Sequence, residues 1–254
     1  MFLPINGQRI NVVAFGSGPR VFLGIGGWAG SWELWQQPFE GLSRTWRTVA
    51  YDHRGAGETV VHPDKITTEG LVADVFAVMD ALDIRRCVLG AESSGARIAL
   101  LAALAQPERI EGLVLVDGSY PGSPRRDNDP FTDLLRSDFE AAINQFMERC
   151  TPGEGLEYIR RWGRDILRRS RAVAAVRLME LGESSDMVER LGEIRMPTLI
   201  IHSARDRIVP LSLSEQLHAR IAGSKLVVLD SDSHVPTMTD AVQVITAIEE
   251  YFGP

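Results

Sequence analysis

The strongest constraint on the fold is an alternation of short apolar segments with longer segments of helical periodicity. The short segments are rich in β-branched residues, and several are apolar at nearly every position, as is typical of strands buried on both faces of a parallel sheet. These predicted strands are 10–15, 20–25, 47–52, 86–91, 112–117, 198–203 and 225–230. Helices are expected at about 32–43, 67–82, 95–106, 212–222 and 238–252. This order predicts an α/β fold with a mostly parallel sheet flanked by helices.

One long interval, residues 119–196, interrupts the alternation. It opens with the loop-forming sequence SYPGSPRRDNDP and continues with apolar residues at three- and four-residue spacing. We therefore expect a helical cap over 119–196, inserted after the strand 112–117 into a core made of 1–118 and 197–254. Some apolar side chains of this cap either line a pocket or pack inside the cap, and spacing does not distinguish the two: Phe131, Leu135, Phe139, Phe146 and Trp162.

Composition and charge argue against several classes of function. The net charge of −7 disfavours a general nucleic-acid binder, which needs concentrated positive charge. No apolar run approaches the roughly 20 residues that cross a bilayer, and the sequence MFLPINGQRI lacks a secretory-signal pattern. Cys87 and Cys150 have neither metal-ligand spacing nor a disulfide framework. We expect a cytoplasmic protein with no metal and no nucleic-acid or membrane partner.

Arginines are concentrated in one part of the expected cap, between residues 160 and 177. They form either an anion site above a pocket or a solvated helix face, and the solvated face is favoured because charge runs usually face water. These arginines are Arg160, Arg161, Arg164, Arg168, Arg169, Arg171 and Arg177.

The segment CVLGAESSGARIALLAAL has the pattern of a strand, a sharp turn and a helix. Such a turn leaves no room for large side chains two residues before and two residues after its tip. If Ser93 is at the tip, these positions are Ala91 and Gly95, which fits the G-x-S-x-G pattern with alanine for the first glycine. If Ser94 is at the tip, one of them is Glu92, whose charged side chain does not fit. Ser93 is therefore the predicted nucleophile.

A serine hydroxyl needs a general base, and the base needs a carboxylate to orient it. Two later strands each lead into a loop with one of these groups, Asp206 in SARDRIVP and His234 in DSDSHVP. Both follow the carboxyl ends of their strands, where ligands bind in open α/β sheets. We predict that His234 is the general base and that Asp206 is its acid. Asp117, at the end of the strand 112–117, is the alternative acid.

The remaining histidines fit the role of base less well. His202 is inside an apolar strand and is expected in the core, whereas His218 is in the middle of a helix and is expected at the surface. His53 and His62 follow the strand 47–52, and only His53 is placed to border a pocket. His234 alone has the strand–loop–helix setting that a general base needs.

Two backbone N–H groups are candidates for binding the negative oxygen of a tetrahedral intermediate. Ser94 directly follows the predicted nucleophile, at the N-terminus of the helix that begins near Gly95. Trp28 lies in the glycine-rich sequence LGIGGWAGSWELW, and its N–H is the second candidate. The side chains of Trp28 and Trp32 are candidate substrate contacts, although packing against the cap explains them equally well.

Taken together, these segments resemble the α/β-hydrolase fold family over nearly the whole chain. The matching segments occur in the family's order: LGIGGW, YDHRGAGET, GAESSGA, SARDRIVP and DSDSHVP. Two positions depart from the common pattern, since Gly26-Gly27 replaces His-Gly in the oxyanion loop and Ala91 replaces a glycine. The resemblance implies an α/β-hydrolase fold with a helical cap after the sixth strand.

The chemistry expected from these residues is hydrolysis of an ester or lactone of a small, largely apolar substrate. Ser93 attacks the carbonyl, His234 takes and returns the proton, and water releases the acyl group, so no cofactor is expected. Carbon–carbon bond hydrolases, perhydrolases and hydroxynitrile lyases share such a triad and stay as alternatives. A non-catalytic ligand receptor is the alternative outside enzymes. The expected partner is a small-molecule substrate, and the oligomeric state, homo-oligomer included, is open.

Overall fold

A computed structural model describes residues 1–120, 129–181 and 186–253. Its centre is an eight-stranded sheet with the order β1-β2-β4-β3-β5-β6-β7-β8. The pairs β1–β2 and β2–β4 are antiparallel, and every other pair is parallel. The predicted mostly parallel sheet is confirmed. The strands are β1 (Phe2–Ile5), β2 (Gln8–Phe15), β3 (Val21–Ile25), β4 (Arg47–Tyr51), β5 (Cys87–Glu92), β6 (Ile110–Val116), β7 (Thr198–Ser203) and β8 (Lys225–Leu229).

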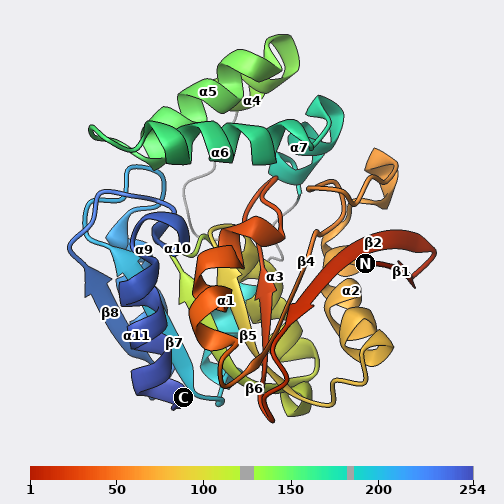
Figure 1. The fold of residues 1–254 in the computed structure, drawn as a ribbon, viewed down its shortest axis with the longest axis vertical. Helices are drawn as coiled ribbons and strands as arrows, with labels where there is room; N and C mark the ends of the chain where they lie inside the picture. Colours follow the sequence, from red (N-terminus) through yellow and green to blue (C-terminus); the bar gives the residue numbers. More distant parts are fainter. Residues whose placement is uncertain (121–128, 182–185, 254) are drawn as a thin grey trace.

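Helices cover both faces of the sheet, as Figure 1 shows. One face carries α1 (Gln36–Leu42), α10 (Pro236–Thr239) and α11 (Ala241–Phe252). The other carries α2 (Thr68–Ala81), α3 (Gly95–Ala105) and α9 (Leu211–Arg220). Short 3-10 helices are η1 (Trp32–Trp35), η2 (Pro63–Lys65), η3 (Pro107–Arg109) and η4 (Leu191–Glu193). None of the described helices has the length and apolarity needed to cross a membrane.

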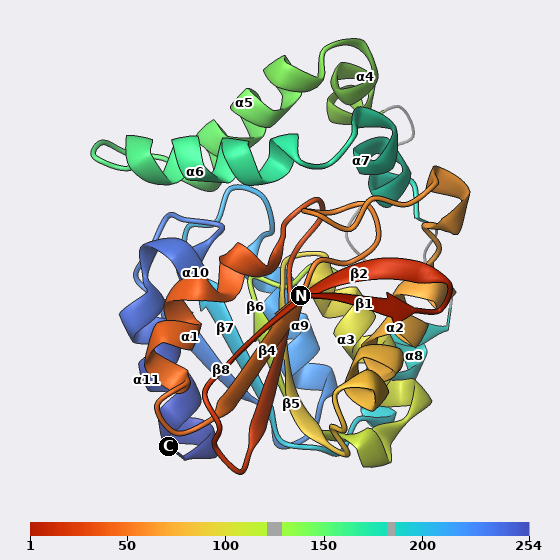
Figure 2. The same cartoon turned by 45° about the vertical axis from the view of Figure 1, so that its right-hand side comes forward.

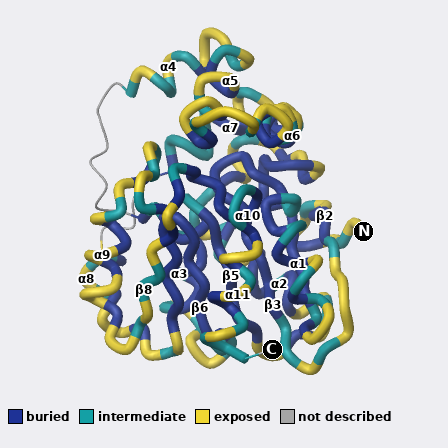
Figure 3. Tube along the Cα trace, turned by 60° about the vertical axis from the view of Figure 1, so that its left-hand side comes forward, coloured by how far each residue is buried: buried dark blue, intermediate teal, exposed yellow. Residues whose placement is uncertain are grey.

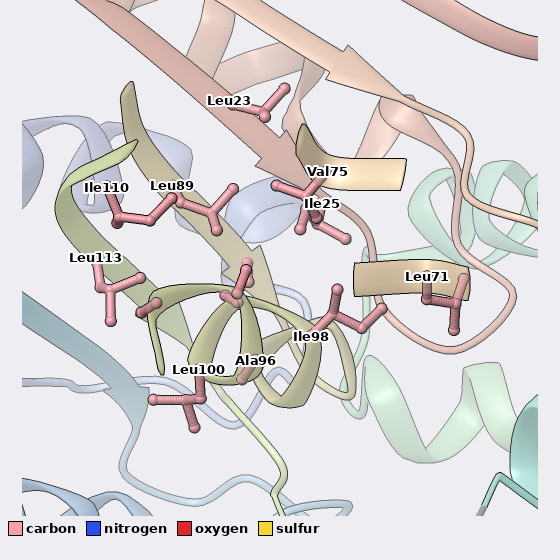
Figure 4. Close-up of a cluster of buried hydrophobic side chains, with 14 of the residues drawn as sticks. Leu23, Ile25, Leu71, Val75, Leu89, Ala96, Ile98, Leu100, Ile110 and Leu113 are labelled. Carbon is pink, nitrogen blue, oxygen red and sulfur yellow. The ribbon is translucent and has the colours of Figure 1, made fainter. Parts of the chain in front are cut away.

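The strands fill two hydrophobic clusters at once because successive side chains of a strand point to opposite faces. In β6, Leu113 and Leu115 join the cluster beneath α2 and α3, whereas Val114 and Val116 join the cluster beneath α1 and α11. Figure 4 shows part of the first cluster, where side chains from β3, β5 and β6 meet those of α2 and α3. Burial is greatest along the central strands (Figure 3), which explains why their sequences are apolar at nearly every position.

The chain between β6 and β7 is helical, as predicted. Figure 2 shows α4 to α7 above the carboxyl ends of the strands, while α8 lies beside the core, where Met187 joins the cluster beneath α2 and α3. Residues 121–128, part of the expected loop, and residues 182–185 lie outside the described residues. The helices are α4 (Pro130–Ser137), α5 (Phe139–Cys150), α6 (Glu157–Arg168), α7 (Ala172–Met179) and α8 (Met187–Arg190).

The strand β1 is the element that the sequence pattern did not predict. It pairs with β2 across a two-residue turn in which Asn6 and Gly7 have φ values of 48° and 72°. Asn-Gly is the favoured sequence for such a hairpin turn, but Pro4 weakens the strand signal. β1 lies at the edge of the sheet, where a proline is tolerated because one side of the strand has no partner.

Candidate active site

Ser93 occupies the tip of the turn between β5 and α3. Its φ is 49°, in the left-handed region that non-glycine residues rarely adopt. The turn is tight, because a Cβ on Gly95 would lie 2.6 Å from the carbonyl oxygen of Gly26. Ala91 is fully buried, and the Ser93 N–H donates to the Val116 carbonyl at 2.9 Å. The surrounding backbone thus holds the serine in its strained conformation.

Ser93, His234 and Asp206 form a continuous chain of hydrogen bonds. The Nε2 atom of His234 is 2.9 Å from the Ser93 Oγ, and its Nδ1 atom is 2.6 Å from Asp206 Oδ2. The other carboxylate oxygen, Oδ1, accepts the N–H groups of Ile208 and Val209 at 2.7 and 3.1 Å. The structure therefore brings together the three side chains that were predicted to act as one unit. An imidazole placed between a hydroxyl and a carboxylate can remove the hydroxyl proton.

The surroundings of His234 favour its protonated form. Burial lowers the pKa of His234, but the charge of Asp206, the hydrogen bond to Asp206 and the charge of Asp117 raise it, and the net pKa lies above 6.5. A raised pKa makes the imidazole a stronger base toward the serine proton. The imidazolium that results is paired with a buried carboxylate.

Asp117, the alternative acid, lies close by but bonds to other groups. Its carboxylate accepts the N–H and the hydroxyl of Ser203 at 2.7 and 3.1 Å. Burial raises the pKa of Asp117, and the positive charge of His234 opposes that effect. One donor atom each from Asp117, Asp206 and His234 lies within 4.8 Å of the others. The short Asp206–His234 hydrogen bond suits an acid–base pair better than a metal centre.

His202, His218 and His62 lie where the sequence placed them, whereas His53 is outside the described pocket linings. His202 is fully buried in β7, and His218 and His62 are exposed. His53 is 2% exposed, and its Nε2 atom lies 3.0 Å from the carbonyl oxygen of Gly27. His53 therefore contacts the glycine-rich loop rather than the serine.

Glu92, directly before Ser93, is a buried carboxyl group that the sequence analysis treated only as a steric problem. Its side chain is 1% exposed, and Oε1 accepts the hydroxyl of Thr237 at 2.8 Å. The second oxygen has no hydrogen-bond partner among the described residues. Burial raises the pKa of Glu92 from 4.5 to about 8; the Thr237 hydrogen bond opposes this, and the charge of Asp206 adds to it. Glu92 is therefore neutral at neutral pH.

Two backbone N–H groups beside the serine lack an internal partner. Within the described part of the chain, neither the Trp28 nor the Ser94 N–H has an acceptor. The loop with Trp28 lies against the turn, because a Cβ on Gly27 would be 2.9 Å from the Cβ of Ser93. The indole Nε1 of Trp28 donates to the Ala175 carbonyl of α7 at 2.9 Å. Free N–H groups in this position can bind a negative oxygen.

A pocket opens beside Ser93, and the empty space in and around it, open solvent included, is about 450 Å³. The core contributes Leu34, Val235 and Met238 to its walls, and the cap contributes Phe146, Met147, Gly163, Ile166 and Leu167. Apart from Ser93, His234 and Glu92, the side chains in its described walls are apolar. The pocket suits a small ligand with an apolar body.

The two tryptophans predicted as substrate contacts lie in different places. Trp28 lines the pocket. Trp32 is outside the described lining. The centroid of its ring lies 6.0 Å from that of Phe15, and its backbone N–H donates to Asp52 at 2.8 Å. The structure therefore brings only Trp28 to the pocket.

Of the apolar cap residues considered from the sequence, only Phe146 is among the described pocket walls. The Phe131 ring packs on the Trp28 ring with centroids 5.5 Å apart and is outside the described lining. Leu135 and Phe139 belong to the hydrophobic cluster inside the cap, and Trp162 packs against the core cluster beneath α1 and α11. Helical spacing identified apolar faces without showing which of them meets the ligand.

Four of the seven arginines between residues 160 and 177 pair with carboxylates of the cap and core, whereas Arg177 donates to the Ile66 carbonyl at 3.1 Å. Arg168 contacts Glu140 at 2.9 Å, and Arg169 contacts Glu33 at 2.6 Å. Arg160 and Arg164 both contact Glu157, at 3.0 and 2.5 Å. No arginine is present in the described lining of the pocket. The geometry therefore disfavours an anion site above the pocket. The predicted solvated face is found at Arg168 but not at Arg160, which is buried.

The cap is hydrogen-bonded to the loops that hold the site. The His234 N–H donates to the carbonyl of Cys150, the last residue of α5, at 2.7 Å. The Ser170 hydroxyl donates to the Gly55 carbonyl at 2.6 Å. The Phe146 ring lies edge-on to the imidazole, with centroids 6.5 Å apart. The cap therefore touches the histidine directly.

Comparison with known proteins identifies the family of this fold. Residues 20–241 match the family described as alpha/beta hydrolase fold. The chain is 26% identical to the karrikin insensitive 2 receptor CA of Petunia hybrida, over 94% of this chain and 93% of that protein. It is 24% identical to the strigolactone esterase D14 of Arabidopsis thaliana, over 93% and 94% of the two chains. Its fold resembles the crystal structure of an enol-lactonase from Burkholderia xenovorans LB400, with a TM-score of 0.89 and 20% identity over 100% of both chains.

Proposed function

Because this chain belongs to the alpha/beta hydrolase fold family, we propose that it is a serine hydrolase that cleaves a carboxylic ester or lactone of a small, largely apolar substrate. The observation that carries the proposal is the hydrogen-bonded chain from Ser93 through His234 to Asp206. His218 also contacts a serine hydroxyl, that of Ser224 at 2.8 Å, but this pair is exposed. At Ser93, by contrast, a buried imidazole and a buried carboxylate converge on one strained hydroxyl. This arrangement makes a neutral alcohol nucleophilic.

In the proposed cycle, the Ser93 Oγ attacks the carbonyl carbon while Nε2 of His234 accepts its proton. The N–H groups of Trp28 and Ser94 bind the resulting oxyanion, and each such donor contributes about 2.7–4 kcal/mol of transition-state stabilisation. The imidazolium then protonates the leaving oxygen as the C–O bond breaks, which leaves an acyl-enzyme. A water molecule deprotonated by His234 attacks the acyl group, releases the acid and restores Ser93. Asp206 keeps the imidazole in the productive tautomer throughout.

The pocket supports an apolar acyl or alcohol group rather than an acidic one. Its described walls are apolar beyond Ser93, His234 and Glu92, and the nearby cap arginines are committed to carboxylates. A carboxylate-bearing substrate, such as the diketone acid of a carbon–carbon bond hydrolase, would lose its hydration there without gaining a counter-charge. An ester or lactone with a short apolar chain meets no such penalty.

The test compares the wild type with Ser93→Ala on p-nitrophenyl acetate, p-nitrophenyl butyrate and γ-lactones. We expect Ser93→Ala to lower kcat/KM at least roughly 10³-fold, because the nucleophile is lost. Ser137→Ala, on the exposed end of α4, is the matched serine-to-alanine control and is expected to keep wild-type activity. A fluorophosphonate probe is expected to label Ser93. Equal activity of Ser93→Ala and the wild type removes Ser93 from the chemistry.

A ligand receptor is the competing candidate, because the Petunia hybrida relative is named a receptor. Turnover separates the two functions. Release of many product molecules per protein supports the enzyme, whereas release of no more than one equivalent supports the receptor. The intact hydrogen-bonded chain at Ser93 favours the enzyme.

A further inference from the structure

The imidazole of His53 is hydrogen-bonded to the carbonyl oxygen of the Gly27–Trp28 peptide, which borders the pocket. His53 follows β4, is 2% exposed, and places Nε2 3.0 Å from the Gly27 carbonyl oxygen. A carbonyl oxygen only accepts hydrogen bonds, and the other ring nitrogen, Nδ1, also lies 3.2 Å from a carbonyl oxygen, that of Arg54. A neutral imidazole has one N–H, and the shorter contact, at Nε2, favours the proton on Nε2, which then donates to the Gly27 carbonyl oxygen. The same oxygen also accepts the Gly30 N–H at 3.1 Å. The Gly27 carbonyl is therefore held by a backbone donor of its own loop and by a side chain from a different strand.

The Gly27 carbonyl and the Trp28 N–H belong to one peptide unit. A trans peptide is planar, and its C=O and N–H point in opposite directions; the described chain contains no cis peptide bond. Holding the carbonyl on one side therefore sets the direction of the N–H on the other. Gly27 and Trp28 both line the pocket, and the Trp28 N–H has no acceptor in the described chain. The carbonyl faces the imidazole, so the N–H faces away from it.

We propose that His53 is a positioning residue that aims the Trp28 N–H at the oxyanion site. This inference rests on the proposed hydrolase function and adds a residue that acts on the transition state without touching the substrate. The loop is glycine-rich, with Gly26, Gly27 and Gly30 around the peptide. Glycine restricts the backbone less than other residues do, so the direction of the N–H depends on the hydrogen bonds to the Gly27 carbonyl, one from Gly30 within the loop and one from His53 outside it.

The loop that carries His53 is held independently of its imidazole. Asp52 accepts the Asn11 side-chain amide and the Glu58 N–H, each at 2.9 Å, on one oxygen. Its other oxygen accepts the Trp32 N–H at 2.8 Å. These bonds fix both the loop after β4 and the far end of the glycine-rich loop. Variants of His53 are therefore expected to keep the fold.

The experiment uses His53→Leu, which removes the donor, and His53→Gln, which supplies an amide N–H in its place. The substrates are an aryl acetate and the matching thionoacetate, in which sulfur replaces the carbonyl oxygen. We expect His53→Leu to lower kcat for the oxygen ester about tenfold to hundredfold with KM within about twofold, because one oxyanion donor is misdirected. On the thionoacetate, His53→Leu is expected to lower kcat far less, because sulfur is a weak hydrogen-bond acceptor and gains little from the donor in the wild type. His53→Gln is expected to regain most of the kcat that His53→Leu loses on the oxygen ester.

His62→Leu is the matched control, because His62 is an exposed histidine of the same loop region and is expected to behave as the wild type. A merely structural role for His53 would lower the rates on both substrates equally, and that result overturns the proposal. Crystal structures of His53→Leu and the wild type give a second readout that needs no activity. An unchanged Gly27–Trp28 peptide in the variant also overturns it. Absence of Ser93-dependent turnover in the wild type, by contrast, refutes the hydrolase function itself.

Discussion

Replacing Glu92 with glutamine is expected to change how the free energy of unfolding depends on pH. Glu92 is buried beside Ser93, and its folded-state pKa is about 8 instead of 4.5, chiefly because burial disfavours the charged carboxylate. Glutamine is nearly the same size and can keep the hydrogen bond from Thr237, but it does not titrate. The variant therefore removes the ionisation and leaves the packing almost unchanged.

The magnitude follows from the two pKa values. Between pH 4.5 and about 8 the unfolded chain has released the Glu92 proton while the folded chain retains it, so the unfolded state binds fewer protons and stability falls as pH rises. At about 1.4 kcal/mol per pKa unit, this group alone lowers the wild-type free energy of unfolding by roughly 3–4 kcal/mol between pH 5 and pH 8. In Glu92→Gln this pH-dependent fall in the free energy of unfolding is absent.

Urea unfolding followed by tryptophan fluorescence at pH 5, 6, 7 and 8 measures the effect. The difference in the free energy of unfolding between Glu92→Gln and the wild type is expected to grow steadily in favour of the variant. Effects that do not depend on pH, such as an unpaired amide of the glutamine, cancel in this comparison. Glu215→Gln, at an exposed position of α9, is the matched control. A difference that stays constant within about 1 kcal/mol from pH 5 to pH 8 refutes the reasoning.

Asp206→Asn is expected to lower kcat roughly 10³- to 10⁴-fold, because the imidazole loses its orienting carboxylate. Asp117→Asn is expected to lower kcat less than tenfold, because this carboxylate bonds to Ser203 instead. Steady-state kinetics on an aryl ester measure both variants, and equal losses contradict the assignment of Asp206 as the acid. At low substrate concentration the rate is expected to rise with pH through a pKa above 6.5, because only neutral His234 accepts the serine proton. The pKa of His234 lies above 6.5 because Asp206 raises it by more than burial lowers it. A pH–rate profile with an apparent pKa below 6.5 speaks against this. Gly95→Ala is expected to destabilise the fold by about 1–3 kcal/mol, because the new Cβ would lie 2.6 Å from the Gly26 carbonyl oxygen; an unchanged urea midpoint would rule out that close approach.

The convergence of Ser93, Asp206 and His234 was predictable because each follows the carboxyl end of a strand. Parallel strands place these ends along one edge, so residues 141 positions apart in the chain meet at hydrogen-bond distance. The helical insertion was also predictable, because the alternation of strands and helices stops over a long interval and resumes at β7. Both predictions rest on backbone periodicity, which local sequence expresses strongly.

The pocket walls were not predictable, because they depend on how the cap lies on the core. Phe146 and Phe131 both sit on apolar faces of cap helices, yet only Phe146 lines the described pocket. Trp32 follows the glycine-rich loop closely, but the hydrogen bond of its N–H to Asp52 places it outside that lining. The roles of His53 and Glu92 were also hidden, because they depend on partners, Gly27 and Thr237, that are distant in sequence.

The hydrogen bond from the His234 N–H to the Cys150 carbonyl joins the last turn of α5 to the loop that bears the imidazole. Any motion that lifts α5 to widen the entrance breaks that bond and frees the imidazole to drift from the hydroxyl. The width of the entrance and the position of the imidazole are thus linked through a single backbone hydrogen bond.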